Sequence, residues 1–124
     1  MSKFFMGTGA VAAGTAVVLG ALGAHALKSQ LDEHLLSVFI TAVEYQMYHA
    51  IALLFVGVIA HLFSGHSLIR YAGVLILAGI VLFCGGLYGL VFTQLQLFGL
   101  IAPLGGFAFI AGWIVLAWGC CRVV

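Results

Sequence analysis

Polar and apolar positions divide this chain into long hydrophobic runs separated by short polar breaks. The few charged side chains leave three uncharged stretches, residues 4–27, 45–69 and 71–121. A helix needs about 20 apolar residues to cross a bilayer, so the first two stretches each fit one crossing. The third fits two, with a turn at residues 93–96, where polar amides are followed by Gly99 and Pro103. The pattern predicts spans near residues 4–27, 44–64, 69–92 and 101–121.

The continuity of the apolar runs identifies these spans as helices. A transmembrane β-barrel would instead show strands of about ten residues in which apolar and polar positions alternate. Short connections make successive helices antiparallel neighbours. We therefore expect an all-α membrane protein in which residues 1–124 form a single domain, an up-down-up-down bundle of four transmembrane helices.

Residues 29–43 follow a different pattern from the spans. Apolar residues recur there at helical spacing, at Leu31, Leu35, Val38, Phe39 and Ala42. Ser29 and Asp32 match a capping box, and the acidic residues Asp32 and Glu33 suit the positive end of a helix. The segment is too polar to cross a bilayer, so it predicts an amphipathic helix at the outer interface, before the second span. The alternative is a simple extension of the second span into solvent.

Composition and charge exclude several classes of protein. Hydrophobic residues make up 65 % of the chain and charged residues 6 %, and the mean hydropathy is +1.32. A soluble domain carries roughly 25 % charged residues, so a soluble protein is excluded. The chain has a net charge of +1, and it lacks the cluster of basic residues that nucleic-acid binding requires. The expected environment is the lipid bilayer.

The positions of the basic residues predict the orientation in the membrane. Lys3, Arg70 and Arg122 share one side of a four-span bundle, whereas Lys28 stands alone on the other. Basic residues favour the cytoplasmic side, so both termini are expected in the cytoplasm. The N-terminal run and the sequence Ala24-His25-Ala26 also resemble a cleaved signal peptide. The uncharged run is longer than the usual hydrophobic region of about 7–15 residues and is rich in glycine, so we expect it to remain as the first span.

Small residues at four-residue spacing predict close packing of the helices, because helices in lipid associate through small faces. The glycines expected at these contacts are Gly20, Gly85, Gly89, Gly106 and Gly112. Packing within one chain is the simpler interpretation. The alternative is that one small face remains free for a homo-oligomer or a larger membrane complex.

Polar groups at membrane depth are costly and therefore mark candidate sites. The predicted topology brings most of them to the outer half of the bundle, and Pro103 is expected to begin the fourth span beside free backbone N–H groups. The candidate ligand-binding residues are His25, Glu44, Tyr45, Gln46, Tyr48, His49, Tyr88, Pro103 and Gly105. Each also has a structural interpretation, such as a hydrogen-bonded core histidine or a tyrosine of the interfacial belt.

The chemistry of these residues predicts binding and not catalysis. His25, Glu44 and His49 are of metal-ligand type, but no HxxxH, HExxH or CxxCH motif is present, and we predict no metal site. No nucleophile or phosphate-binding motif occurs either, so neither an enzyme nor a catalytic residue is expected. The first hypothesis is a non-enzymatic protein that binds a lipid, a quinone-like molecule or a larger membrane complex. The alternatives are a small oligomeric transporter or proton-coupled carrier using Glu44 and His49, and a haem-binding redox subunit.

Four motifs in order along the chain carry a family resemblance. They are Gly20–Leu27 (GALGAHAL), Thr41–Ala50 (TAVEYQMYHA), Phe83–Tyr88 (FCGGLY) and Ala102–Trp113 (APLGGFAFIAGW). Together they resemble the YgdD / transmembrane protein 256 family. The chain departs from the family pattern at three positions, with Cys84 and Gly86 in place of serines and Ala102 in place of threonine. The resemblance implies a four-helix protein of the bacterial inner membrane and no established activity.

Overall fold

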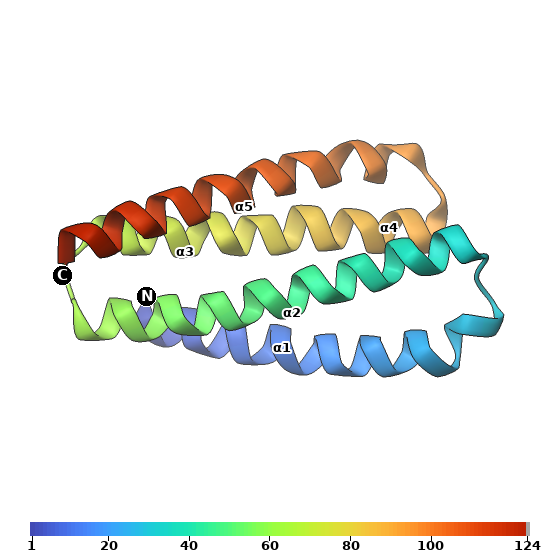
Figure 1. Cartoon of the computed structure of the whole chain (residues 1–124), viewed down its shortest axis with the longest axis horizontal. Helices are drawn as coiled ribbons and strands as arrows, with labels where there is room; N and C mark the ends of the chain where they lie inside the picture. The colour runs from blue at the N-terminus through green and yellow to red at the C-terminus, as the bar shows by residue number, and fades with distance from the viewer. Residues whose placement is uncertain (124) are drawn as a thin grey trace.

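Antiparallel helices account for nearly all of the computed structural model, which describes residues 1–123 (Figure 1). The α-helices are α1 Ser2–His25, α2 Glu33–Leu62, α3 Ser67–Gly79, α4 Gly85–Thr93 and α5 Gln96–Val123. A short 3-10 turn, Leu27–Ser29, follows α1, and a π-helical turn, Ile80–Cys84, joins α3 to α4. Within residues 1–123 there is no β-strand.

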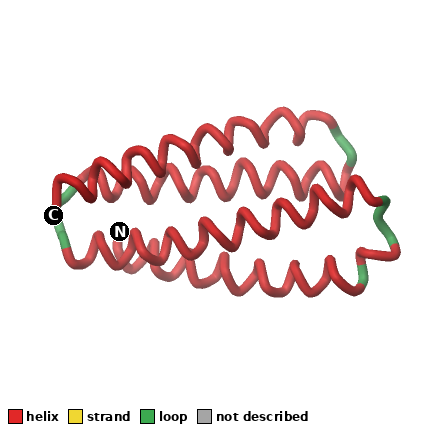
Figure 2. Tube along the Cα trace, in the orientation of Figure 1, coloured by secondary structure: helices red, strands yellow, loops and turns green. Residues whose placement is uncertain are grey.

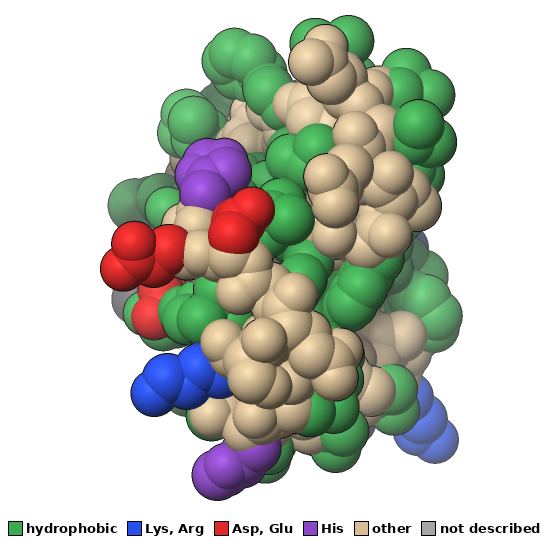
Figure 3. All heavy atoms as spheres, turned by 90° about the vertical axis from the view of Figure 1, so that its right-hand side faces the viewer, with side chains coloured by type: hydrophobic (Ala, Val, Ile, Leu, Met, Phe, Trp, Pro, Cys, Tyr) green, Lys and Arg blue, Asp and Glu red, His purple; other side chains and the backbone are tan. Residues whose placement is uncertain are grey.

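The four-helix bundle expected from the sequence is confirmed. Four helical stretches are long and apolar enough to cross a membrane, the third being α3, the π-turn and α4 in succession, Ser67–Thr93. Both termini lie at one end of the bundle together with the α2–α3 connection, and the other two connections lie at the opposite end (Figures 1 and 2). Viewed from that opposite end, acidic side chains gather on one side, beside hydrophobic surface (Figure 3).

The separate interfacial helix expected at residues 29–43 is not present. Helix α2 begins at Glu33 and continues without a break to Leu62, so the alternative of an extended second span is the observed one. The reason is that the apolar stripe of this segment packs on protein. Phe39 is fully buried, and its ring centroid lies 5.6 Å from that of Tyr88 and 6.0 Å from that of Phe92.

The start of α2 is fixed by its N-cap, Asp32. The Oδ1 atom of Asp32 accepts a hydrogen bond of 2.7 Å from the backbone N–H of Leu35. We expect Asp32→Ala to lower the free energy of unfolding by about 1 kcal/mol, since a free N–H group at a helix start loses its acceptor. Circular dichroism during unfolding in detergent measures this change. Asp32→Asn, an equally good cap, is the control, and an equal loss in both variants would contradict the capping role.

The fourth span begins earlier than the sequence predicts. Helix α5 starts at Gln96, directly after a tight turn in which Gln94 has a left-handed φ of 56° and donates its N–H to the Leu90 carbonyl. Pro103 therefore lies inside α5, not at its beginning. A proline removes the hydrogen bond to the carbonyl four residues earlier, here that of Gly99. Transmembrane helices tolerate this loss where neighbouring groups can compensate for it.

Helix α1 packs on α2 through small residues at intervals of seven. Gly9, Ala16 and Gly23 are buried along this seam. A Cβ atom on Gly9 would lie 2.9 Å from the Ala50 carbonyl oxygen, and one on Gly23 would lie 2.8 Å from the Phe39 ring. A seven-residue spacing of contacts is typical of left-handed crossings of about 20°. Ala16 belongs to a small-residue repeat with Gly20 that the sequence shows, whereas Gly9 and Gly23 were not expected at helix contacts.

The five glycines expected at helix contacts fall into two groups. A Cβ atom on Gly89 would lie 2.5 Å from the Phe98 ring, and one on Gly112 would lie 2.9 Å from Ile76, so both positions favour glycine. A Cβ on Gly20 would lie 3.5 Å from Val43, which is an ordinary contact distance. Gly85 and Gly106 instead border open space. A Cβ on Gly85 would meet nothing within 4 Å, and one on Gly106 only the Phe83 ring at 3.9 Å. The expectation of packing does not hold for these two, because each faces a groove.

The arrangement of the helices leaves such grooves open. Helix α1 packs chiefly on α2, and α5 chiefly on α3, the π-turn and α4. In Figure 1, α5 and α1 form the two outer edges of the bundle, with α3, α4 and α2 between them. Each outer helix therefore leaves one flank of the inner pair uncovered.

Candidate functional site

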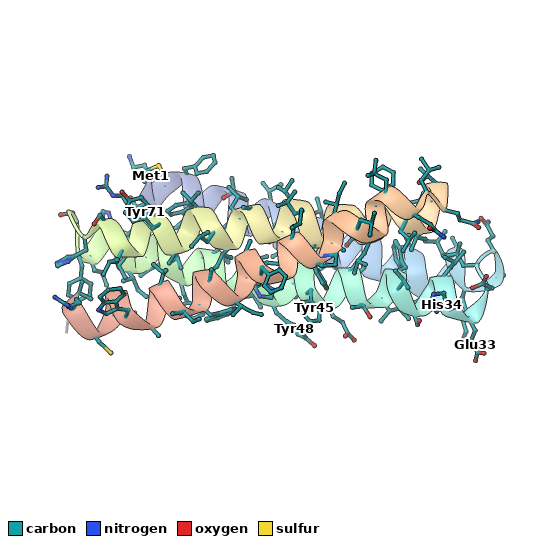
Figure 4. The ribbon with its side chains drawn as sticks, turned by 90° about the horizontal axis from the view of Figure 1, so that it is seen from above. Met1, Glu33, His34, Tyr45, Tyr48 and Tyr71 are labelled. Carbon is teal, nitrogen blue, oxygen red and sulfur yellow. The ribbon has the colours of Figure 1, made fainter. Side chains whose placement is uncertain are left out.

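The polar side chains of the spans lie close to the middle of the bundle, most of them in the half away from the termini. Gln46 and His49 are close to the midpoint of α2, which runs from Glu33 to Leu62. In Figure 4, Tyr45 and Tyr48 project from the middle of the bundle, whereas Glu33 and His34 mark its end. These residues lie deeper than the sequence predicts, because α2 begins at Glu33, about 16 Å along the helix before the expected start at residue 44.

Gln46 joins three helices through hydrogen bonds. Its Nε2 atom donates to the Ala12 carbonyl and to Thr15 Oγ1 on α1, both at 2.9 Å. The Tyr88 hydroxyl of α4 donates to Gln46 Oε1 at 2.7 Å. We call Ala12, Thr15, Gln46 and Tyr88 the Gln46 cluster. Among residues 1–123, no buried side-chain nitrogen or oxygen lacks a partner, so the cluster is satisfied within the protein.

A groove of 520 Å³ opens beside this cluster between α1 and α4. We call it the α1 groove. Helix α1 contributes one wall, formed by Gly7, Thr8, Val11, Ala12 and Thr15. The opposite wall comes from the π-turn and α4, namely Ile80, Val81, Cys84, Gly85 and Tyr88. The surface is mostly apolar, and Gln46 lies in it with its polar atoms already paired.

His49 is held in one neutral form by its two partners. Its Nδ1 atom lies 2.7 Å from the Tyr45 carbonyl, and its Nε2 atom lies 3.2 Å from the indole nitrogen of Trp113. A carbonyl can only accept and an indole N–H can only donate. The proton of the imidazole is therefore on Nδ1, and Nε2 carries the lone pair. The ring also stacks on Phe109, with centroids 3.5 Å apart and planes at 16°.

A second groove, of 420 Å³, opens beside His49 between α2 and α5. We call it the aromatic groove because most of its lining residues carry rings. It is lined by Tyr45, His49, Phe83, Phe109 and Trp113, with Gly106 and Ile110 completing it. It shares no lining residue with the α1 groove.

The predicted site residues thus divide into two clusters, and some belong to neither. Gln46 and Tyr88 meet in the Gln46 cluster, and Tyr45 and His49 meet in the aromatic groove. Gly105 is buried against the backbone of Phe83, whose ring centroid lies 4.8 Å from that of Tyr45. The other predicted residues are exposed away from both clusters or at their rim: His25, Glu44, Tyr48 and Pro103.

Several residues that build the clusters were not predicted from the sequence. Thr15, Phe83, Phe109 and Trp113 all lie in apolar runs, where each looks like an ordinary membrane residue. One signal was available for Trp113, since an indole N–H in a span needs an acceptor. The acceptor itself, a histidine 64 positions earlier in the chain, could not be identified from spacing.

Metal binding finds no support in this arrangement. Within residues 1–123 no three His, Cys, Asp or Glu side chains lie close enough to hold a metal ion. His49 would have to release the Trp113 indole before its Nε2 atom could bind a metal.

Comparison with known proteins shows which family has a similar sequence. The family described as "Protein of unknown function (DUF423)" matches residues 19–106. The UPF0382 membrane protein SAB0533 of Staphylococcus aureus is 49 % identical over 114 residues, 92 % of each chain. The UPF0382 membrane protein YwdK of Bacillus subtilis is 47 % identical over 92 % of this chain and 93 % of its own. No solved structure matches.

Proposed function

Since the chain belongs to the DUF423 family of membrane proteins of unknown function, we propose a function from its own surface. In this proposal the protein is a non-enzymatic multi-pass membrane protein, and its α1 groove holds one hydrocarbon chain of a membrane lipid. The observation that carries this proposal is an open apolar groove beside a polar cluster whose members are all paired.

The state of the polar groups favours a hydrocarbon chain over a polar headgroup. Gln46 uses both its amide nitrogen and its carbonyl oxygen within the protein. A headgroup would have to displace these bonds, and buried polar groups are costly to leave unpaired in lipid. A hydrocarbon chain displaces none of them and covers the apolar walls formed by Val11, Ile80 and Val81.

The groove is long enough to hold a stretch of hydrocarbon chain. The α1 wall runs from Gly7 to Thr15, about 12 Å at 1.5 Å per residue. Glycines on both walls keep it open, since a Cβ on Gly7 or Gly85 would meet nothing within 4 Å.

The orientation and the cellular membrane are part of the same proposal. Lys3, Arg70 and Arg122 all belong to the ends of helices at the bundle end that carries the termini. This supports cytoplasmic termini in a bacterial inner (plasma) membrane. We also infer, on the four sequence motifs, that this family coincides with the YgdD / transmembrane protein 256 family.

The two alternative functions have no specific observation in their favour. A proton-coupled carrier would use Glu44 and His49, but Glu44 is exposed, and both His49 ring nitrogens are engaged by protein atoms. Haem ligation would need the same His49 nitrogen that Trp113 occupies.

Native mass spectrometry of protein released from lipid nanodiscs tests lipid binding in the α1 groove. We expect Gly85→Leu to fill the groove and to reduce the fraction carrying a bound phospholipid by about tenfold, which corresponds to 1.4 kcal/mol. Gly14→Leu is the matched control, because Gly14 is equally open but does not line the groove. Circular dichroism checks that both variants are folded. Equal retention in Gly85→Leu and the wild type, or equal loss in both variants, would contradict the proposal.

A further inference from the structure

We infer that the aromatic groove is a second and separate binding site, which takes the planar ring of a membrane-soluble, quinone-like molecule. This inference does not depend on lipid binding in the α1 groove, because the two grooves share no residue. Its volume of 420 Å³ falls within the range of small-molecule sites, roughly 300–1,000 Å³.

The walls of this groove indicate a ring and not an alkyl chain. The His49 ring lies at 19° to the plane of Tyr45 and at 16° to that of Phe109, whereas Tyr45 and Phe109 are tilted by 36° to each other. Phe83 lies against Tyr45 with ring centroids 4.8 Å apart. Offset and edge-to-face contacts between rings contribute about 0.5–1.5 kcal/mol each beyond the burial of area. The α1 groove, whose only aromatic lining residue is Tyr88, offers no comparable surface.

The polar atoms of the groove indicate a neutral ligand that carries hydrogen-bond acceptors. His49 is neutral, and both its nitrogens are occupied, so the groove presents no charge of its own. Among the described residues, the Tyr45 hydroxyl has no hydrogen-bond partner, and Tyr45 is 39 % exposed. A free hydroxyl donor at the rim of an aromatic surface matches the carbonyl oxygen of a quinone. Trp113 is 47 % exposed. Its indole N–H already donates to His49, and this bond holds the Trp113 side chain in place on the side of the groove formed by α5.

Gly106 borders the open side of the aromatic groove. A Cβ at this position would meet only the Phe83 ring, at 3.9 Å, so a larger side chain would occupy the groove without a clash against the backbone. Gly99 on the same helix is equally unhindered, with Leu90 at 3.8 Å, and it does not line the groove. Gly106→Leu and Gly99→Leu are therefore a matched pair.

Tryptophan fluorescence provides the test, because Trp113 lines the groove and Trp118, the second tryptophan, does not. The experiment titrates decylubiquinone, a short-chain quinone that quenches indole fluorescence, into the Trp118→Phe protein in phospholipid nanodiscs. We expect saturable quenching of Trp113, with an apparent Kd at least about fivefold weaker in Gly106→Leu and unchanged in Gly99→Leu. Tyr45→Phe is expected to weaken binding by about fivefold, the loss of one hydrogen bond of about 1 kcal/mol.

Trp113→Phe, which retains only Trp118, reports quenching by quinone dissolved in the surrounding lipid. The inference is overturned if Trp113 is quenched linearly and to the same extent as Trp118, or if Gly106→Leu and Gly99→Leu behave alike. Relief of the quenching by n-decanol at a concentration equal to that of the quinone would also overturn it, because that alcohol competes as a chain without a ring. Gly85→Leu, which fills only the α1 groove, should leave the quinone titration unchanged. The proposals for the two grooves are therefore tested independently.

Discussion

Gly105→Ala is expected to destabilise the bundle by about 3 kcal/mol, the upper end of the usual cost of overpacking. A Cβ atom there would collide with the backbone nitrogen of Phe83 and lie 2.7 Å from its Cα and Cβ atoms. A backbone cannot move aside as a flexible side chain can, so α5 would have to shift away from the π-turn. The measurement is the loss of helical circular dichroism as SDS is titrated into protein in mild detergent.

Gly106→Ala is the control for this prediction. A Cβ on Gly106 lies at an ordinary contact distance of 3.9 Å from the Phe83 ring, and alanine stabilises a helix relative to glycine by up to about 1 kcal/mol. The neighbouring substitutions should therefore change stability in opposite directions. Similar destabilisation by both would mean that α5 does not approach the π-turn as closely as the structure has it.

Gln46→Leu is expected to lower stability by about 2 kcal/mol. The substitution removes three hydrogen bonds, to the Ala12 carbonyl, to Thr15 and from Tyr88. Hydrogen bonds between transmembrane helices contribute about 0.6 kcal/mol on average and up to about 1.7 kcal/mol. The lost partner also leaves the Tyr88 hydroxyl without its acceptor in an apolar setting. Unfolding in SDS measures the change.

A double-mutant cycle separates the Gln46–Tyr88 bond from general packing. Tyr88→Phe should cost about 1 kcal/mol in the wild type. In the Gln46→Leu background it should be neutral or stabilising, because it then removes a hydroxyl that has no acceptor. Tyr48→Phe, which removes an exposed hydroxyl from the same helix as Gln46, should have no effect in either background. An additive cycle would show that Tyr88 does not bond to Gln46.

The two stability determinants also shape the two proposed sites. Gly105 lets α5 approach Phe83, a wall of the aromatic groove. The Gln46 cluster ties α1 to α2 and α4 and so holds the walls of the α1 groove at a fixed separation. The groove-filling variants at Gly85 and Gly106 avoid both determinants, so they test binding without loosening the bundle.

The number of spans, the class of fold and the shared side of the termini follow from the sequence alone. These features depend on the length and hydropathy of continuous segments, which are local properties of the chain. The N-terminal region of α2 was also recognisable, since Asp32 carries a capping signal within a few residues of the helix start.

Tertiary structure alone decided which face of each helix is buried and which polar groups meet. In water, an amphipathic pattern identifies the buried face of a helix. In a bilayer the surrounding lipid is as apolar as the protein interior, so that signal is lost. The sequence therefore could not distinguish the closed Gly105 from the open Gly106, or pair His49 with Trp113. The amphipathic stripe at residues 29–43 misled for the same reason, because it packs on neighbouring helices as readily as on a membrane surface.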